Sequence, residues 1–159
     1  MSTNAMMNLT YGLFMLSAKD GEKDNGCIVN TVSQVTSAPN VVTVAVGKAN
    51  YTREMIKKAQ CFNVSVLSED APFEIFTRFG FQSGRDVDKL IDFSDYERTY
   101  DGVIYLNKYA NAVLNCEVTS MRELSTHTLF VAYVNTSKVL SDVPSVTYNY
   151  YQTNIKPKR

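Results

Sequence analysis

The sequence is poor in the residue types from which metal centres and disulfide frameworks are built. It has one histidine, three cysteines and no tryptophan among its 159 residues. Because Cys27, Cys61 and Cys116 are widely separated, no paired CxxC motif exists for zinc or iron, and we expect no metal site. Isolated cysteines of this kind are usually reduced core residues of cytoplasmic proteins. The sequence therefore predicts a cytoplasmic location.

Two other absences narrow the range of functions. Sixteen basic residues balance sixteen acidic ones, whereas nucleic-acid-binding domains usually carry a basic excess. No run reaches the roughly 18 apolar residues of a membrane-spanning helix, and the first residues lack the basic and apolar segments of a signal peptide. We therefore expect one domain that contacts neither nucleic acid nor a membrane.

The spacing of apolar residues predicts a mainly β fold with short helices, as in an antiparallel barrel. Two turn signals, Asp20-Gly21 and Asn25-Gly26, predict a hairpin after the first strand. A proline and acidic residues after Ser68 indicate the start of a second helix. The expected strands cover residues 9–18, 30–36, 41–46, 62–67, 103–106, 110–120 and 126–140, and the expected helices cover 52–60 and 68–80, with a short one from Val87.

A polar segment runs from Asn25 to Pro39, where small amides and hydroxyls lie among β-branched residues. On strands these residues would place hydrogen-bonding groups along one face, against which a polar ligand can lie. A flavin has such requirements, because its ring edge and ribityl chain need several hydrogen-bond partners. The candidate partners in this segment are Asn30, Thr31, Ser33, Gln34 and Thr36.

A second polar group follows the apolar strand at 41–46. Lys48, Asn50 and Thr52 come where a helical pattern begins, and a helix N-terminus beside a cation suits a phosphate. The same residues also have a purely structural explanation, since Asn50 or Thr52 can cap the helix by itself. The sequence is compatible with both interpretations.

Four stretches of the chain follow one another in a recognisable order. They are 25–39, 48–52 (Lys-Ala-Asn-Tyr-Thr), 79–86 (Phe-Gly-Phe-Gln-Ser-Gly-Arg-Asp) and 126–131 (Thr-His-Thr-Leu-Phe-Val). In this order they resemble the flavin reductase-like family of FMN-binding split barrels. Within that family the likeness is to flavoredoxin and to the flavin domain of rubredoxin-linked oxidoreductases. It extends over one domain, residues 7–152, and leaves 1–6 and 153–159 as terminal segments.

The resemblance implies a six-stranded antiparallel split β-barrel with short peripheral helices, which forms a homodimer. It also implies non-covalent FMN, reduced by NADH or NADPH, and a loop from Ser83 to Lys89 that closes over the phosphate end. The cofactor-binding residues that it implies are Asn30, Thr31, Val32, Ser33, Gln34, Val35, Thr36, Lys48, Asn50, Thr52, Ser83, Arg85 and Lys89.

His127 and the aromatic tail each have two interpretations. A lone histidine at the head of an apolar strand is often structural, but the resemblance places His127 on the nicotinamide side, as the candidate catalytic residue. One departure from the family pattern lies in the same strand, where Ala132 stands in place of a common glycine. Tyr148, Tyr150 and Tyr151 either pack at a dimer seam or shield the flavin.

The leading functional hypothesis is an oxidoreductase that passes electrons from a nicotinamide nucleotide to FMN and on to an acceptor. The alternative is an FMN-carrying electron-transfer protein that a partner protein reduces. A rubredoxin or other acceptor protein would have to be a separate chain, because this sequence has no CxxC pair. A third possibility, a β-barrel interaction protein without cofactor, leaves the polar segment unexplained.

Overall fold

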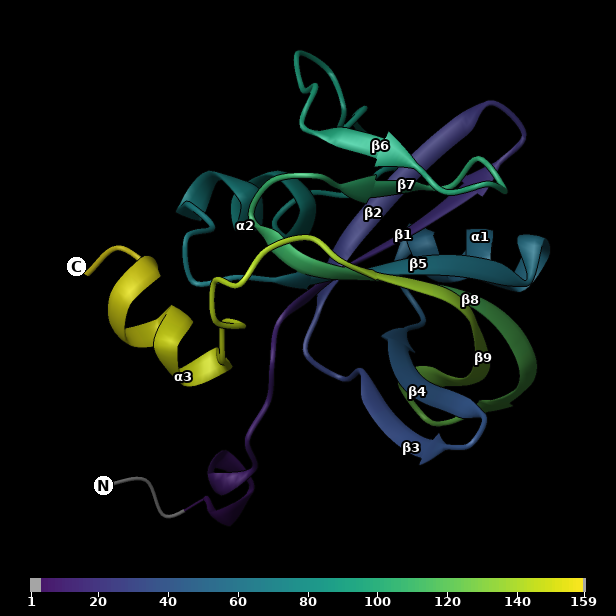
Figure 1. Ribbon diagram of the computed structural model, residues 1–159, viewed down its shortest axis with the longest axis horizontal. Coiled ribbons are helices and arrows are strands. Elements are labelled where there is room, and N and C mark those ends of the chain that lie inside the picture. Colours follow the sequence, from purple (N-terminus) through teal and green to yellow (C-terminus); the bar gives the residue numbers. More distant parts are fainter. Residues whose placement is uncertain (1–3, 159) are drawn as a thin grey trace.

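One large antiparallel sheet dominates the computed structural model of the protein, which describes residues 4–158 (Figure 1). Its strand order is β2-β1-β5-β8-β9-β4-β3, and a two-stranded ribbon, β6–β7, forms a second sheet. The strands are β1 (Phe14–Asp20), β2 (Lys23–Val29), β3 (Ser33–Ser37), β4 (Asn40–Gly47), β5 (Cys61–Leu67), β6 (Tyr96–Arg98), β7 (Ile104–Leu106), β8 (Ala110–Glu123) and β9 (His127–Val139).

The first hairpin joins β1 to β2 through a tight turn at Gly21. Gly21 has a φ of +59°, a left-handed conformation that glycine adopts without steric cost. The second predicted turn, Asn25-Gly26, is wrong, because both residues lie inside β2, where Gly26 pairs with Ser17. A side chain at Gly26 would collide with Met15. This glycine is therefore required by close packing between β1 and β2.

The long strands β8 and β9 bend together and carry β4 and β3 to the far part of the sheet (Figure 1). Their register shifts between Asn115 and Cys116 and again between Val118 and Ser120. Such bulges add local bend and twist to a strand pair. At the end of this curve, β3 forms the sheet edge and all of its residues are exposed.

Apolar side chains form two core clusters. The first joins the curved sheet to helix α1 (Tyr51–Ala59), and the alternation of β4 buries Val42, Val44 and Val46 within it, as the two-residue period of a strand requires. The second lies under helix α2 (Phe73–Gly80), whose Ile75 and Phe79 are fully buried. The two clusters are separate, and the groove that lies between them has one core on each side.

Short helices lie at the periphery of the sheet (Figure 1). Asn50 caps the first of them, since its side-chain oxygen accepts a hydrogen bond from the Thr52 amide at 3.0 Å. The C-terminal helices pack against α2 through the rings of Tyr151 and Phe76, whose centroids are 4.5 Å apart. The helical segments are η1 (Ala5–Asn8), α1 (Tyr51–Ala59), α2 (Phe73–Gly80), α3 (Tyr148–Tyr150) and the π-helical turn η2 (Tyr151–Ile155).

The expectation of a mainly β fold with short peripheral helices is confirmed. The main sheet has seven strands rather than six, because the polar segment is divided between β2 and β3. The short helix predicted from Val87 is wrong. There, the amides of Asp86 and Val87 both donate to the Ser83 carbonyl, and successive turns cover residues 84–92. Within residues 4–158, no helix is long and apolar enough to cross a bilayer.

Candidate functional site

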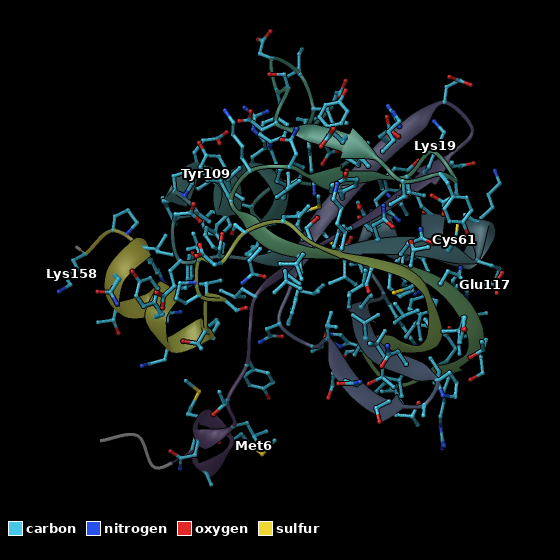
Figure 2. All side chains as sticks on the ribbon, viewed as in Figure 1. Met6, Lys19, Cys61, Tyr109, Glu117 and Lys158 are labelled. Carbon is cyan, nitrogen blue, oxygen red and sulfur yellow. The ribbon has the colours of Figure 1, made fainter. Side chains whose placement is uncertain are left out.

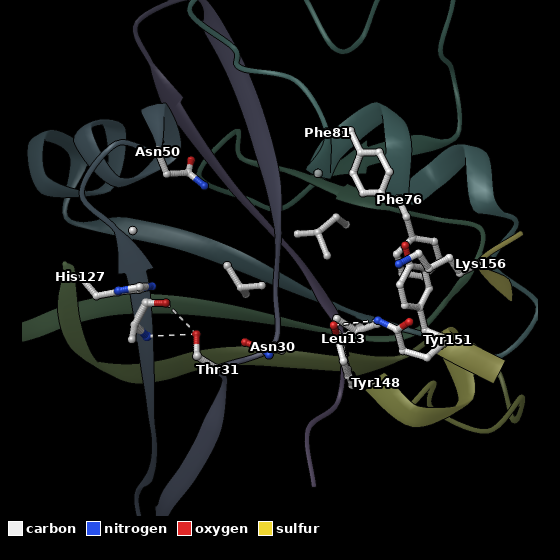
Figure 3. A pocket seen from close by; sticks show the side chains of 16 residues that line it. Leu13, Asn30, Thr31, Asn50, Phe76, Phe81, His127, Tyr148, Tyr151 and Lys156 are labelled. Atoms are coloured by element: carbon white, nitrogen blue, oxygen red, sulfur yellow. Dashed lines mark hydrogen bonds between the residues drawn. The ribbon is translucent and has the colours of Figure 1, made fainter. Parts of the chain in front are cut away.

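A groove of about 470 Å³ lies between the sheet and the C-terminal helices (Figure 3). Its walls come from β2 and the loop after it, from the ends of β4 and β9, from α2, and from α3 with η2. We call it the main groove. The polar and aromatic side chains of interest that line it are Asn30, Thr31, Asn50, His127, Tyr148 and Tyr151.

A second hollow of about 450 Å³ adjoins the main groove, and we call it the polar hollow. Both cavities are bordered by Ile28, Gly47, Asn50, Gly80 and Phe81. The polar hollow reaches from these residues to the loop that follows α2, which contributes Gln82, Ser83, Gly84 and Lys89. The two cavities therefore share a border and form one continuous site.

Lys89 is a buried cation at the polar hollow, with 4% of its surface exposed. Its Nζ donates to the carbonyls of Gly26, at 2.7 Å, and Phe79, at 2.9 Å. Within residues 4–158 it forms no ion pair with a carboxylate. Burial lowers the pKa of Lys89. An ammonium has three donors, so one remains for a ligand after the two carbonyls.

The loop from Ser83 to Lys89 is fastened to α1 by Arg85. The Arg85 guanidinium donates to the Ala49 carbonyl at 2.9 Å, forms an ion pair with Glu54 and lies over the Tyr51 ring. The Ser83 hydroxyl accepts a hydrogen bond from the Arg85 amide at 3.1 Å. Arg85 therefore closes the loop over the start of α1, while Ser83 lines the polar hollow.

Thr52 lies beneath the polar hollow rather than on its surface. Its side chain is fully buried, and its hydroxyl accepts a hydrogen bond from Asn25 Nδ2 at 2.9 Å. Gly84 packs so closely on Asn25 that a side chain there would collide with it. Beside them, burial raises the pKa of the Cys27 thiol, which keeps it in the neutral form.

The polar segment is split by the structure. Asn30 and Thr31 line the main groove (Figure 3), and the Thr31 hydroxyl holds its loop to β4 by donating to the Ala45 carbonyl at 2.7 Å. Val32 packs against the first core cluster. The remaining candidates Ser33, Gln34, Val35 and Thr36 are exposed on β3 and line neither cavity.

His127 borders the main groove, whereas Lys48, which lies close to it in the fold, does not. His127 is exposed and borders the main groove at the start of β9, opposite Gly47 of β4 (Figure 3). Its Nδ1 is 2.8 Å from the Thr126 hydroxyl. Lys48 borders neither cavity, and its ammonium lies 3.6 Å from the Glu123 carboxylate. The structure thus brings Asn30, His127 and the loop after α2 to one site but directs Lys48 away from it.

Sequence reasoning missed most of the wall opposite Asn30. Phe76, Phe81 and Gln152 line the main groove. Phe76 and Gln152 belonged to no predicted motif, and Phe81 lay in the stretch 79–86 without being named as a binding residue. Tyr148 and Tyr151 were predicted either to pack at a dimer seam or to shield the flavin, and neither was named as a binding residue. The unusual aromatic content near the C-terminus was the one signal available, but its placement against α2 depends on contacts between distant parts of the chain.

None of the three cysteines is paired, and Cys61 lies far from the groove. It pairs with Glu117 in the sheet, at the opposite side of the molecule from Lys158 (Figure 2). Among residues 4–158, no group of three or more histidine, cysteine, aspartate or glutamate side chains is arranged to hold a metal ion.

Comparison with known proteins gives close relatives over nearly the whole chain. The chain is 34% identical over 158 residues to a ferric-chelate reductase (NAD(P)H) of Archaeoglobus fulgidus, covering 99% of this chain and 93% of the relative. It is 37% identical over 151 residues to a high molecular weight rubredoxin of Moorella thermoacetica, covering 95% of this chain. The chain spans only 66% of that second relative's length.

The fold comparison agrees with these relatives. A crystal structure of flavoredoxin from Methanosarcina acetivorans superposes with a TM-score of 0.75 at 24% identity, covering 87% of this chain and 74% of that one. The model of the flavin reductase-like domain matches residues 6–158. The split-barrel expectation is thereby confirmed. The chain belongs to the flavin reductase-like domain family and is a flavin-dependent oxidoreductase.

Proposed function

We propose that the flavin of this oxidoreductase is FMN, with its phosphate in the polar hollow and its ring in the main groove. The observation that carries this assignment is Lys89, a buried ammonium with no carboxylate partner among the described residues. A buried charge is costly unless it is paired. A phosphate monoester would supply the missing negative charge and accept the remaining N–H donor.

Other groups around the polar hollow suit the same phosphate. The Ser83 hydroxyl and the Asn50 amide border it, and the start of α1 contributes the positive end of its dipole. Arg85 acts indirectly, because its guanidinium is already committed to Ala49 and Glu54. We infer that Arg85 holds the loop in place and that Lys89 with Ser83 contacts the ligand.

The main groove offers what an isoalloxazine ring needs. Leu13, Ile28 and Phe76 provide apolar surface, and Asn30 provides polar groups at the edge. FMN, when bound, accepts the hydride of a nicotinamide nucleotide. The chain itself then has to orient the nicotinamide and exclude water. His127 lies at the rim of the groove, where it can orient the carboxamide of the nicotinamide. Tyr148 and Tyr151 line the same groove and would cover the other end of the ring.

The relatives support a choice of electron donor and acceptor. The ferric-chelate reductase named for NAD(P)H supports a nicotinamide nucleotide as the donor, and the relative named a high molecular weight rubredoxin supports a rubredoxin-type acceptor on a separate chain. We propose a cytoplasmic homodimer, which the three free cysteines and the fully exposed β3 edge support.

Binding measurements test the cofactor assignment. Flavin fluorescence titrations should show that the protein binds FMN at least tenfold more tightly than riboflavin or FAD. Lys89→Met should remove most of the difference between FMN and riboflavin, whereas the control Lys108→Met should not, because Lys108 is exposed, pairs with Asp95 and lines neither cavity. Equal affinity of the unaltered protein for FMN and riboflavin would exclude a phosphate at the polar hollow.

A second measurement distinguishes the enzyme from an electron carrier. Under anaerobic conditions, NADH or NADPH alone should bleach the FMN absorbance of the loaded protein. If neither nucleotide does so while a reduced rubredoxin does, the protein is an electron-transfer module that a partner reduces, and the oxidoreductase acting on nicotinamide is ruled out.

A further inference from the structure

A cluster of cations lies where β8 ends and β9 begins, and none of its residues lines either cavity. Lys48, Arg53 and Lys57 all lie within 4 Å of the same Glu123 carboxylate, at 3.6, 3.2 and 3.5 Å. Three positive charges therefore meet one negative charge, which leaves two in excess. We call these three residues the basic cluster.

The cluster is held in a fixed arrangement. Arg53 Nε donates to the Thr128 hydroxyl at 2.7 Å, and that hydroxyl contacts the Glu123 carboxylate at 3.0 Å. Thr128 is fully buried, so it anchors Arg53 to β9. The side chains of Lys48 and Lys57 are 39% and 36% exposed, which leaves their ammonium groups accessible to a ligand from solvent.

Along the chain, the basic cluster lies next to residues of the main groove, near the place where the nicotinamide would bind. His127 borders the main groove, and Thr128, the next residue of β9, contacts Arg53. Lys48 directly follows Gly47, which also borders the groove. The flavin phosphate is assigned to Lys89 in the polar hollow, so the basic cluster is left without a ligand in that scheme.

We propose that the basic cluster binds the 2′-phosphate of NADPH and makes the protein prefer NADPH to NADH. A phosphate monoester carries about −1.5 to −2 charges at pH 7, which matches the excess of the cluster. NADH has a neutral hydroxyl at the same position, so the basic cluster would not increase its affinity. This inference rests on the proposed function, because it assumes that the nicotinamide enters the main groove beside His127.

The first test measures phosphate recognition without any redox reaction. By calorimetry, the FMN-loaded protein should bind adenosine 2′,5′-bisphosphate about tenfold more tightly than 5′-AMP, and added salt should reduce the difference because the contact is electrostatic. Lys57→Gln and Lys48→Gln should each reduce it. Equal binding of the two nucleotides would overturn the proposal, even if the protein reduces FMN with a nicotinamide.

The second test uses the anaerobic reduction of bound FMN. Lys57→Gln should lower the ratio of kcat/KM for NADPH to that for NADH by about tenfold. Lys58→Gln is the matched control, because Lys58 is the next residue of α1 but pairs with Asp20 at 3.0 Å on another side of the helix; its ratio should not change. An unaltered ratio in Lys57→Gln would overturn the proposal.

A third outcome separates two sources of phosphate. If Lys57→Gln and Lys48→Gln instead lower the FMN content of the purified protein and leave the nucleotide ratio as it was, the cluster serves the flavin phosphate and the NADPH assignment fails. If no nicotinamide nucleotide reduces the flavin at all, the proposed function fails, whereas the calorimetric comparison still decides whether the cluster binds a 2′-phosphate.

Discussion

At the scale of single residues, Lys89 links the stability of the protein to its ligand. Burial lowers its pKa from the ordinary value of 10.5, so the folded protein loses this proton at a lower pH than the unfolded chain. The unliganded protein therefore gains stability as the pH rises from the lowered pKa towards 10.5. The same loss of charge removes the attraction for a phosphate. Stability and FMN affinity should thus change in opposite directions.

We expect the dissociation constant of FMN to rise as the pH increases through the lowered pKa of Lys89. Fluorescence titrations between pH 7 and 10.5 measure it. Riboflavin is the control ligand, because it shares the ring but lacks the phosphate. Its affinity should depend only on contacts with the ring and ribityl chain. Parallel changes for both flavins would show that Lys89 does not contact the phosphate.

His127 supports a different prediction, because it is exposed at the groove rim and contacts Thr126 rather than the core. Its replacement should then affect orientation and not folding. We expect His127→Ala to keep its FMN content and thermal midpoint but to slow anaerobic flavin reduction about 10 to 100 fold, as the loss of one orienting hydrogen bond worth roughly 1.4 to 2.7 kcal/mol implies.

Two further observations complete the His127 test. His127→Gln retains a hydrogen-bond donor and should recover part of the rate measured by stopped flow. If His127→Ala instead loses stability and FMN together while the remaining loaded protein reacts at the normal rate, His127 is structural.

At the scale of elements, the C-terminal helices form part of the binding site. Tyr151 of η2 is 93% buried by relative surface and packs on Phe76 of α2, while its neighbours Tyr148 and Gln152 line the groove. Gln152 also donates to the Tyr148 hydroxyl at 2.7 Å. Tyr151 therefore fastens a wall of the groove to the second core cluster.

Tyr151→Ala should leave a cavity between η2 and α2. Removal of a large buried ring costs about 3 to 5 kcal/mol of unfolding free energy, and the loosened wall should weaken FMN binding as well. Urea denaturation and flavin titration measure the two effects. Tyr151→Phe keeps the ring and should change neither by much; a large effect of Tyr151→Phe would mean that the hydroxyl, not the packing, is essential.

The helices and strands also show how much of the fold could be predicted from the sequence. The strands near β4, β5, β8 and β9 were predicted because their apolar residues alternate or form uninterrupted runs, and α1 because Asn50 precedes an apolar-periodic segment. Gly26 was taken for a turn residue, since the need for a small residue against Met15 arises only once β1 and β2 are paired. The burial of Lys89 was likewise not predictable, as it depends on carbonyls of β2 and α2.

At the scale of the whole molecule, ligand binding and assembly should be linked. If the flavin site is completed by a second copy of the chain, FMN should stabilise the dimer and raise its thermal midpoint in proportion to the logarithm of its concentration. Light scattering and thermal melts with and without FMN test this. A monomer that retains one FMN per chain would contradict a shared site.

The two core clusters give the molecule a seam, and the main groove lies along it. Val29 on one wall packs on the first cluster, whereas Leu13 and Phe76 on the other belong to the second. A flavin in this position would connect two cooperative units that the strands of the sheet otherwise link. Without flavin, calorimetry should therefore resolve separate melting of the α2 side and the barrel side, and hydrogen exchange should be faster in residues 70–93 and 146–155. With FMN bound, the two transitions should merge into one.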